Sequence, residues 1–332
     1  MPTPGSLVIR AFALGASAMA AICSAPSCNR ADAQLPRTYT LRVDNDAFDF
    51  WMAPYNRPDQ EYTSGVHVTV DGGDAPWWAR RYLSALPCTT KTLQCRTSSV
   101  EIGQDIYSPA TSVNDPVPAP GSRLNAGWLY VDQAARLLRT DRADALTITA
   151  GVTGPPSLAR ETQHIAHDLA PSFNRPTDWS RQIPFEPGVD VGYEQQRRVV
   201  DVERGSLGFD VVPRAAASLG NVATNAELGV ETRAGWHLRH PWLPSDGPTE
   251  IALIVGATER AVVRDLFLDA RAPFDTNRAG HRPFVSSGEM GLEFRHRWLT
   301  LSYRAVDDSR SYDRAPRWHP WASLRGGVTV DR

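Results

Sequence analysis

Three consecutive polar residues, Asp44, Asn45 and Asp46, end the alternating segment "TYTLRVDNDAFDF" (38–50). Thr63 follows in the next alternating segment, "EYTSGVHVTV". If the two segments form one antiparallel hairpin, Asp46 and Thr63 lie near each other across it. Carboxylate, amide and hydroxyl oxygens are the ligands that Ca²⁺ takes in proteins. The pattern is consistent with a calcium site, but Asn and Asp also start turns for purely local reasons.

A second polar pair lies in "SLARETQHIAHDLA" (157–170), which has the periodicity of an amphipathic helix. Gln163 and His167 are four residues apart and therefore share one face, where Gln163 could orient the imidazole of a general base. His164 is the weaker candidate, and a metal pair of His164 and His167 is the alternative. Ser157 is the predicted helix cap. The opposite face carries an apolar stripe of Leu158, Ile165 and Leu169.

The elements that must position these residues show a period of two. In residues 145–152, 227–238 and 291–306, apolar and polar side chains alternate. Such segments are about 10–12 residues long, beyond the usual soluble strand. Their polar faces carry both charge signs and glycine. A soluble sandwich also alternates, but these features favour an outer-membrane β-barrel with lipid outside and a polar lumen.

About twelve antiparallel strands are expected, an even number as in closed bacterial barrels. They cover residues 38–47, 61–71, 98–108, 125–138, 144–154, 186–201, 207–221, 225–238, 249–263, 284–296, 298–309 and 319–330. With the N-terminus in the periplasm, residues 155–184 form a long extracellular loop that contains the helix. Aromatic residues near strand ends are expected at the membrane interfaces. They are Trp128, Tyr130, Trp236, Trp242, Trp298, Trp318 and Trp321.

Residues 1–33 have the features of a secretory signal peptide: a positive charge, the apolar run "AFALGASAMAAICSA" and "ADA" before the expected cleavage site. The run is too short to span a membrane as a helix. We expect residues 34–332 to form a single transmembrane barrel domain. In an exported chain, Cys88 and Cys95 are expected to form a disulfide that closes a small loop.

Composition and motifs exclude several classes of protein. The formal net charge is −2 and there is no basic stripe, so nucleic-acid binding has no support. The sequence contains no G-x-S-x-G, H-E-x-x-H, phosphate-loop or dinucleotide motif. A serine hydrolase or a soluble metalloprotease is therefore not indicated.

Six blocks of the sequence resemble, in this order, the outer-membrane lipid A 3′-O-deacylase family. They are "VDNDAF", "DQEYTSGVHVTV", "IGQDIYSP", "NAGWLYV", "GVTGPPSLARETQHIAHDL" and "DWSRQIPFEPGVDVGYE", within residues 38–195. Weaker similarity, "LFLDA" and "FVSSGEMGLEFR", extends into the C-terminal half. The resemblance implies a twelve-stranded barrel with its site between the wall and an extracellular-loop helix.

The resemblance also implies residue roles. His167 matches the general base and Gln163 its partner, while Asn45 and Thr63 complete the expected catalytic set. Asp46, with Asn45, is the expected metal ligand. In that family His activates a water for attack on an ester carbonyl, and Ca²⁺ stabilises the oxyanion.

We therefore expect a monomeric, Ca²⁺-dependent esterase of the outer membrane that acts on lipid A of lipopolysaccharide. The alternatives are a barrel phospholipase, or a non-enzymatic structural or pore-type barrel of the same fold.

The opening segment raises a geometric difficulty. Strict alternation places Asp46 in the lumen with Arg42 and Asp44, and places Asn45 on the lipid side. A regular strand cannot direct both Asn45 and Asp46 to one site. Either the strand bends at this point, or the site straddles the rim of the barrel.

Overall fold

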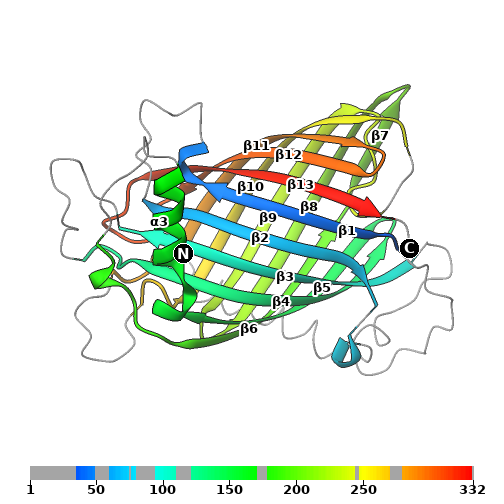
Figure 1. The fold of residues 1–332 in the computed structure, drawn as a ribbon. Helices are drawn as coiled ribbons and strands as arrows, with labels where there is room; N and C mark the ends of the chain where they lie inside the picture. Colours follow the sequence, from blue (N-terminus) through cyan, green and yellow to red (C-terminus); the bar gives the residue numbers. More distant parts are fainter. Residues whose placement is uncertain are drawn as a thin grey trace, which may run out of the picture.

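Long antiparallel strands make up most of the molecule and close into a barrel (Figure 1). The computed structural model describes residues 35–48, 60–74, 76–79, 94–109, 121–169, 178–243, 247–269 and 279–330. The strands are β1 (Arg37–Asn45), β2 (Glu61–Gly73), β3 (Gln94–Ser108), β4 (Ala126–Arg139), β5 (Arg142–Thr153), β6 (Pro187–Arg197), β7 (Val200–Arg204), β8 (Leu207–Gly220), β9 (Ala223–Trp236), β10 (Glu250–Asp265), β11 (Phe284–His296), β12 (Leu299–Ser309) and β13 (Trp318–Val330). Helical segments in the connections are η2 (Asp46–Phe48), η3 (Pro155–Ser157), α3 (Ala159–Leu169) and η5 (Trp179–Arg181).

Strands that follow one another along the chain are antiparallel neighbours in the wall. The first strand, β1, pairs with the last, β13, and β6 pairs with β8, so the ring is closed. The short β7 continues the wall position of β6, because both pair with β8 in succession. The predicted antiparallel barrel with 12 strands is therefore confirmed. A closed ring leaves no strand edge unpaired, which the hydrocarbon core of a bilayer requires.

The alternation along each strand separates two environments. On β2, Val66 and Val68 point outward and are exposed, while His67 between them is buried inside the barrel. On β10, Ile251 and Leu253 are likewise exposed on the outer face. A band of exposed apolar side chains around a closed barrel is stable because lipid is the solvent there.

The predicted aromatic belt is partly wrong. Trp128 and Tyr130 lie inside the barrel, in a cluster with Val222 and Leu266. Trp321 also lines an inner cavity. Both faces of "GWLYV" (127–131) are apolar, so periodicity alone does not fix which face points inward. The indoles that are exposed as predicted belong to Trp236, Trp298 and Trp318.

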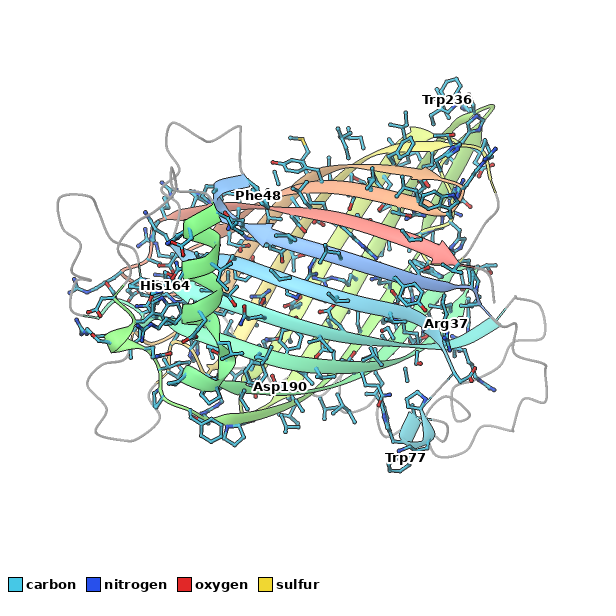
Figure 2. All side chains as sticks on the ribbon, in the orientation of Figure 1. Arg37, Phe48, Trp77, His164, Asp190 and Trp236 are labelled. Atoms are coloured by element: carbon cyan, nitrogen blue, oxygen red, sulfur yellow. The ribbon has the colours of Figure 1, made fainter. Side chains whose placement is uncertain are left out.

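The two ends of the barrel differ in their connections. At one end, residues 140–141 and 297–298 form two of the tight turns. Short turns are typical of the periplasmic side of outer-membrane barrels. The helical segments η2 and α3 lie at the opposite, extracellular end (Figure 1). Figure 2 shows Phe48 and His164 at the extracellular end, and Arg37, Trp77 and Trp236 at the periplasmic end.

The periplasmic connection after β2 is described only in part. Its residues Trp78 and Ala79 pack against Ala135 and Leu137, on the outward face of β4. Residues 1–33, Cys88 and the side chain of Cys95 lie outside the described residues. The signal peptide, the domain limits and the disulfide remain predictions. No helix in the described ranges has the length and apolarity needed to cross a bilayer.

Candidate active site

The polar end of β1 contains a change of backbone conformation. Asp44 points into the lumen, where its carboxylate lies 3.2 Å from the imidazole of His67. Asn45 therefore faces outward, opposite Ala322 of β13. At Asp46 the strand ends and η2 begins, so the alternation does not continue to this residue. The expectation of Asp46 as a lumenal strand residue is wrong, and the alternative of a bend describes the structure.

The segment η2 folds over the outward face of the wall. It contacts β13 and β2. Ala322 is fully buried, although Leu324 on the same outward face is exposed. The hydroxyl of Tyr303, on β12, donates a hydrogen bond to the carbonyl oxygen of Phe48 (2.9 Å). These contacts hold η2 on the lipid side of the barrel.

Asn45 and Asp46 both accept backbone hydrogen bonds. The Oδ1 atom of Asn45 accepts from the backbone N–H of Ala47 (2.7 Å), the local turn chemistry expected of Asn. The Oδ2 atom of Asp46 accepts from the backbone N–H of Gln60 (2.9 Å), across the connection between β1 and β2, and the Asp46 side chain is buried. These bonds fix the direction of both side chains.

Thr63 lies across the hairpin from Asp46. Asn45 pairs with Ser64, so Asp46 and Thr63 are the next residues on either side. The pairing of β2 with β3 is irregular at Thr63. Tyr62 and Ser64 pair with successive residues of β3, so Thr63 is an extra residue in β2, as in a β-bulge. Its hydroxyl is buried and has no hydrogen-bond partner in the described part of the chain.

The predicted helix forms α3, and it lies against the outward face of β3 and β4. Trp128 points inward, so Gly127 points outward toward the helix. A Cβ atom on Gly127 would lie only 2.1 Å from Ser157 Oγ and 2.3 Å from Ala159 Cβ. The Nε2 atom of Gln104 also donates to the carbonyl oxygen of Ser157 (2.6 Å). Glycine at 127 therefore permits the close contact between the wall and the start of α3.

The predicted cap of this helix is wrong. The hydroxyl of Ser157 donates to the carbonyl oxygen of Gly154 (2.6 Å) and so belongs to η3. The helix α3 begins two residues later, at Ala159. The proline pair before Ser157 favours a separate short turn, since proline fits the first positions of a helix.

Gln163 is held against the wall by a tryptophan. It is only 3% exposed, and its Oε1 atom accepts a hydrogen bond from the indole N–H of Trp179 (2.8 Å). Trp179 is itself buried in a cluster with Ile106 of β3 and Ala159 of α3. The Gln163 side chain is therefore fixed from the side of the returning loop.

The returning loop is anchored in turn. The side-chain amide of Asn125 donates to the carbonyl oxygen of Asp178 (2.8 Å). The Asp178 carboxylate caps η5 by accepting from the backbone N–H of Ser180 (2.9 Å). Hydrogen bonds from the Ser180 side chain and backbone lower the pKa of Asp178.

His167 lies one turn beyond Gln163 on the same side of α3 and is half-buried. His164 is exposed on a different side. Ile165 and Leu169, from the apolar stripe, are exposed and point away from the wall. The helix thus turns Gln163 and His167 toward the barrel and Ile165 and Leu169 away from it, while its other polar side chains are exposed.

The candidate residues occupy two adjacent parts of the outward wall. Asn45, Asp46 and Thr63 lie where β1 passes into η2 and where β2 begins. Gln163 and His167 lie on α3, over β3 and β4. Because β2 pairs with β3, the two parts are neighbours along the wall.

The oxygen donors in the first part suit a hard cation. The Asp46 carboxylate, the Asn45 amide oxygen and the Thr63 hydroxyl are donors of the kind that Ca²⁺ takes. The buried Thr63 hydroxyl, with its unused hydrogen-bonding capacity, fits this interpretation. Within the described ranges, no group of three or more His, Cys, Asp or Glu residues is placed to hold a metal ion. A metal pair of His164 and His167 therefore lacks a third such ligand there.

Two residues of the site were not assigned a role from the sequence. Trp179 and Gly127 lie in the blocks "DWSRQIPFEPGVDVGYE" and "NAGWLYV". A tryptophan in a polar loop and a glycine at the start of an apolar strand are the available signals. Neither signal shows that Trp179 and Gly127 position α3.

A closed barrel of long antiparallel strands with an apolar outer band is the architecture of an outer-membrane protein. The chain belongs to the LpxR outer membrane protein family, whose model matches residues 11–330. The family resemblance in the sequence and the outer-membrane location are thereby confirmed.

A solved structure of LpxR has a similar fold. LpxR from Salmonella typhimurium is similar with a TM-score of 0.70 and 17% identity, over 88% of this chain and 99% of that chain. The β-domain of the Bordetella autotransporter BrkA has a TM-score of 0.41 and 9% identity, over 90% and 99% of the two chains. The translocator domain of the autotransporter NalP from Neisseria meningitidis has a TM-score of 0.38 and 11% identity, over 99% and 98%. Comparison with curated protein sequences gives no match.

Proposed function

We propose that the protein hydrolyses an acyl ester of lipid A in the outer membrane, as a Ca²⁺-dependent esterase of the lipid A 3′-O-deacylase type. One observation carries this proposal: Gln163 and His167 face the outward wall of the barrel, while the apolar side chains of Ile165 and Leu169 are exposed on the side away from it. A lipid of the outer leaflet can reach such a site laterally, without entering the lumen. Each barrel carries the complete set of residues, so a monomer suffices.

In the proposed reaction, His167 accepts a proton from a water molecule as its oxygen attacks the ester carbonyl carbon. The carbonyl oxygen becomes the oxyanion of a tetrahedral intermediate. When the bond to the sugar oxygen breaks, the imidazolium returns the proton to that oxygen, so the products are a free fatty acid and a sugar hydroxyl. Gln163 orients the imidazole, and Trp179 holds Gln163.

Asp46, Asn45 and Thr63 are the residues that would hold Ca²⁺. When bound there, the cation supplies electrostatic stabilisation of the oxyanion. The protein's own contribution is to fix these oxygens through η2 and the irregularity at Thr63, next to the wall that carries α3.

A paired substitution on α3 tests the catalytic assignment. We expect His167→Ala to lower ester hydrolysis by roughly 10²–10⁴-fold, the range for loss of a general base. His164→Ala is the matched control, because His164 is on the same helix but exposed on another side. The assay offers lipid A and phospholipid together in mixed micelles. Full activity of His167→Ala would contradict the assignment, and preferential release of phospholipid fatty acids would favour the phospholipase alternative.

The metal assignment has its own test. Chelation should abolish hydrolysis and added Ca²⁺ should restore it. We expect Asp46→Asn to raise the Ca²⁺ concentration for half-maximal activity by about tenfold or more, since the charge of the ligand set tunes calcium affinity. An unchanged calcium requirement in Asp46→Asn would remove Asp46 from the site.

The side chains inside the barrel do not favour the alternative in which the protein is a pore. An extracellular-side cavity of about 390 Å³ and a periplasmic-side cavity of about 680 Å³ share only Arg42 as a lining residue. Side chains between them form one hydrogen-bonded network: the Tyr62 hydroxyl donates to Asp44 (2.8 Å), and the hydroxyl of Tyr130 lies 2.9 Å from Nδ1 of His67. This network joins side chains of β1, β2 and β4 between the two cavities.

A further inference from the structure

Two arginines face each other inside the barrel. Arg42 of β1 is directly paired with Arg325 of β13. Both line the periplasmic-side cavity of about 680 Å³. Like charges directly opposite on neighbouring strands destabilise a sheet unless something compensates them.

The protein compensates this pair only in part. The Arg42 guanidinium lies 3.5 Å from the Asp44 carboxylate, whereas Arg325 has no ion pair with any residue in the described ranges. Neither guanidinium donates a hydrogen bond to a described residue. Arg325 is also exposed to the lumen, so a solute in the cavity can reach it.

The nearby carboxylates already have other partners. Glu293 lies 2.6 Å from Arg295, and Asp71 lies 2.7 Å from Arg136. Glu101 accepts a hydrogen bond from the Thr69 hydroxyl (2.7 Å). Six arginines and five carboxylates line the cavity, and Arg325 is one of these arginines.

A further donor adjoins the two arginines. Thr40 and Gly327 pair with each other one step closer to the periplasm, on the same strands and the same inward face. The Thr40 hydroxyl is buried and has no hydrogen-bond partner among the described residues. Gly327 adds no side chain beside this hydroxyl. Two guanidinium groups and one hydroxyl, at neighbouring positions of the wall, thus line the same cavity.

We propose that Arg42, Arg325 and Thr40 bind a small water-soluble oxyanion, a phosphate or a carboxylate, that enters through the periplasmic mouth of the barrel. Guanidinium groups match the geometry of both anions by donating paired N–H bonds. A lipid headgroup is not the ligand, because the closed wall separates this inward site from the bilayer. The site is distinct from the residues proposed for ester hydrolysis, which lie on the outer face.

Calorimetric titration of the full-length protein in detergent tests the proposal, with inorganic phosphate in one series and acetate in another. We expect saturable binding of at least one of the two anions. Arg325→Gln should weaken that binding by about tenfold or more, as for loss of a charge-assisted hydrogen bond. Arg297→Gln is the matched control: Arg297 lines the same cavity from the turn between β11 and β12, and its loss should change affinity by less than about twofold.

Two outcomes overturn the proposal. The first is no saturable binding of either anion. The second is equal weakening of binding by Arg325→Gln and Arg297→Gln, which would show that the anion responds only to the overall electrostatic potential of the lumen. Arg325→Lys is the control for misfolding, because it keeps the positive charge but lacks the paired N–H donors of the guanidinium group. It should bind more weakly than the wild type while keeping the heat-modifiable migration of a folded barrel. Ester hydrolysis is measured separately, so failure here does not touch the proposed function.

Discussion

At the scale of single residues, the candidate site depends on how Gln163 is held. A glutamine amide offers an acceptor on one side and donors on the other. The indole N–H of Trp179 uses the acceptor oxygen, which leaves the amide N–H groups for other partners. This assignment makes Trp179 a positioning residue for Gln163, and through Gln163 for His167.

We predict that Trp179→Phe lowers ester hydrolysis by roughly fivefold to tenfold, the effect of losing one hydrogen bond of about 1 kcal/mol. Trp242→Phe is the control. Its indole N–H donates to the carbonyl oxygen of Arg139 on the periplasmic side, far from the site. Initial rates on lipid A micelles measure both variants. Equal rates for Trp179→Phe and the wild type would show that Gln163 needs no support from the loop.

At the scale of elements, α3 works only if it lies close to the wall. Gly127 permits that contact, because any side chain there meets Ser157 and Ala159. Overpacking of this kind costs about 1–3 kcal/mol, which a loop helix can avoid by moving away from the strands. Displacement of α3 would move Gln163 and His167 together.

We predict that Gly127→Ala reduces hydrolysis by about tenfold or more, since small misplacements of catalytic groups are costly, while the barrel stays folded. Gly288→Ala is the control, because a Cβ atom at Gly288 meets no atom within 4 Å. Heat-modifiable migration reports the fold of each variant, and the lipid A assay reports activity. Wild-type activity in Gly127→Ala would argue against a fixed position of α3.

The elements were largely predictable from the sequence, because a period of two over long segments specifies lipid-exposed strands. Where both faces of a strand are apolar, as around Trp128 and Tyr130, periodicity does not show which face points into the barrel. It also could not show where a strand stops. Asp46 leaves β1 because η2 packs on β13, a contact between distant parts of the chain.

The candidate site was predictable only in its residue types. The i, i+4 spacing places Gln163 and His167 on one face. Which face meets the wall depends on Gly127 and Trp179, and those tertiary contacts leave no periodic signal. The apolar stripe of the helix was visible in the sequence, but the sequence did not show that Ile165 and Leu169 point away from the wall and are exposed.

At the scale of the whole molecule, the periplasmic mouth contains a histidine whose neutral form the fold favours. The Nε2 atom of His240 lies 2.9 Å from the Thr140 carbonyl oxygen, so Nε2 carries the proton. Nδ1 then accepts the backbone N–H groups of Trp242 (3.4 Å) and Leu243 (3.2 Å). Burial is the largest cause and lowers the pKa of His240, as do the charges of Arg198 and Arg233, while the hydrogen bond to the Thr140 carbonyl and the charge of Asp201 oppose this shift.

The sign of the effect on stability follows from proton binding. Near the ordinary pKa of histidine the unfolded chain binds more protons than the folded one, so stability rises with pH. The contribution of His240 is present above that pKa and is lost as the pH falls below it. We predict that Tm drops more for the wild type than for His240→Asn between about pH 7.5 and about pH 5.5. An equal drop in both proteins would mean that His240 is not linked to unfolding.

The proposed function depends most on His167 as the group that activates the water for removal of an acyl chain from lipid A. Mass spectrometry tests this role on lipid A from cells that make the wild-type protein, His164→Ala or His167→Ala, with equal amounts of folded barrel. We expect lipid A that lacks one acyl chain in cells with the wild type or His164→Ala, and intact lipid A with His167→Ala. Deacylated lipid A in the His167→Ala cells, or intact lipid A in the wild-type cells, would contradict it.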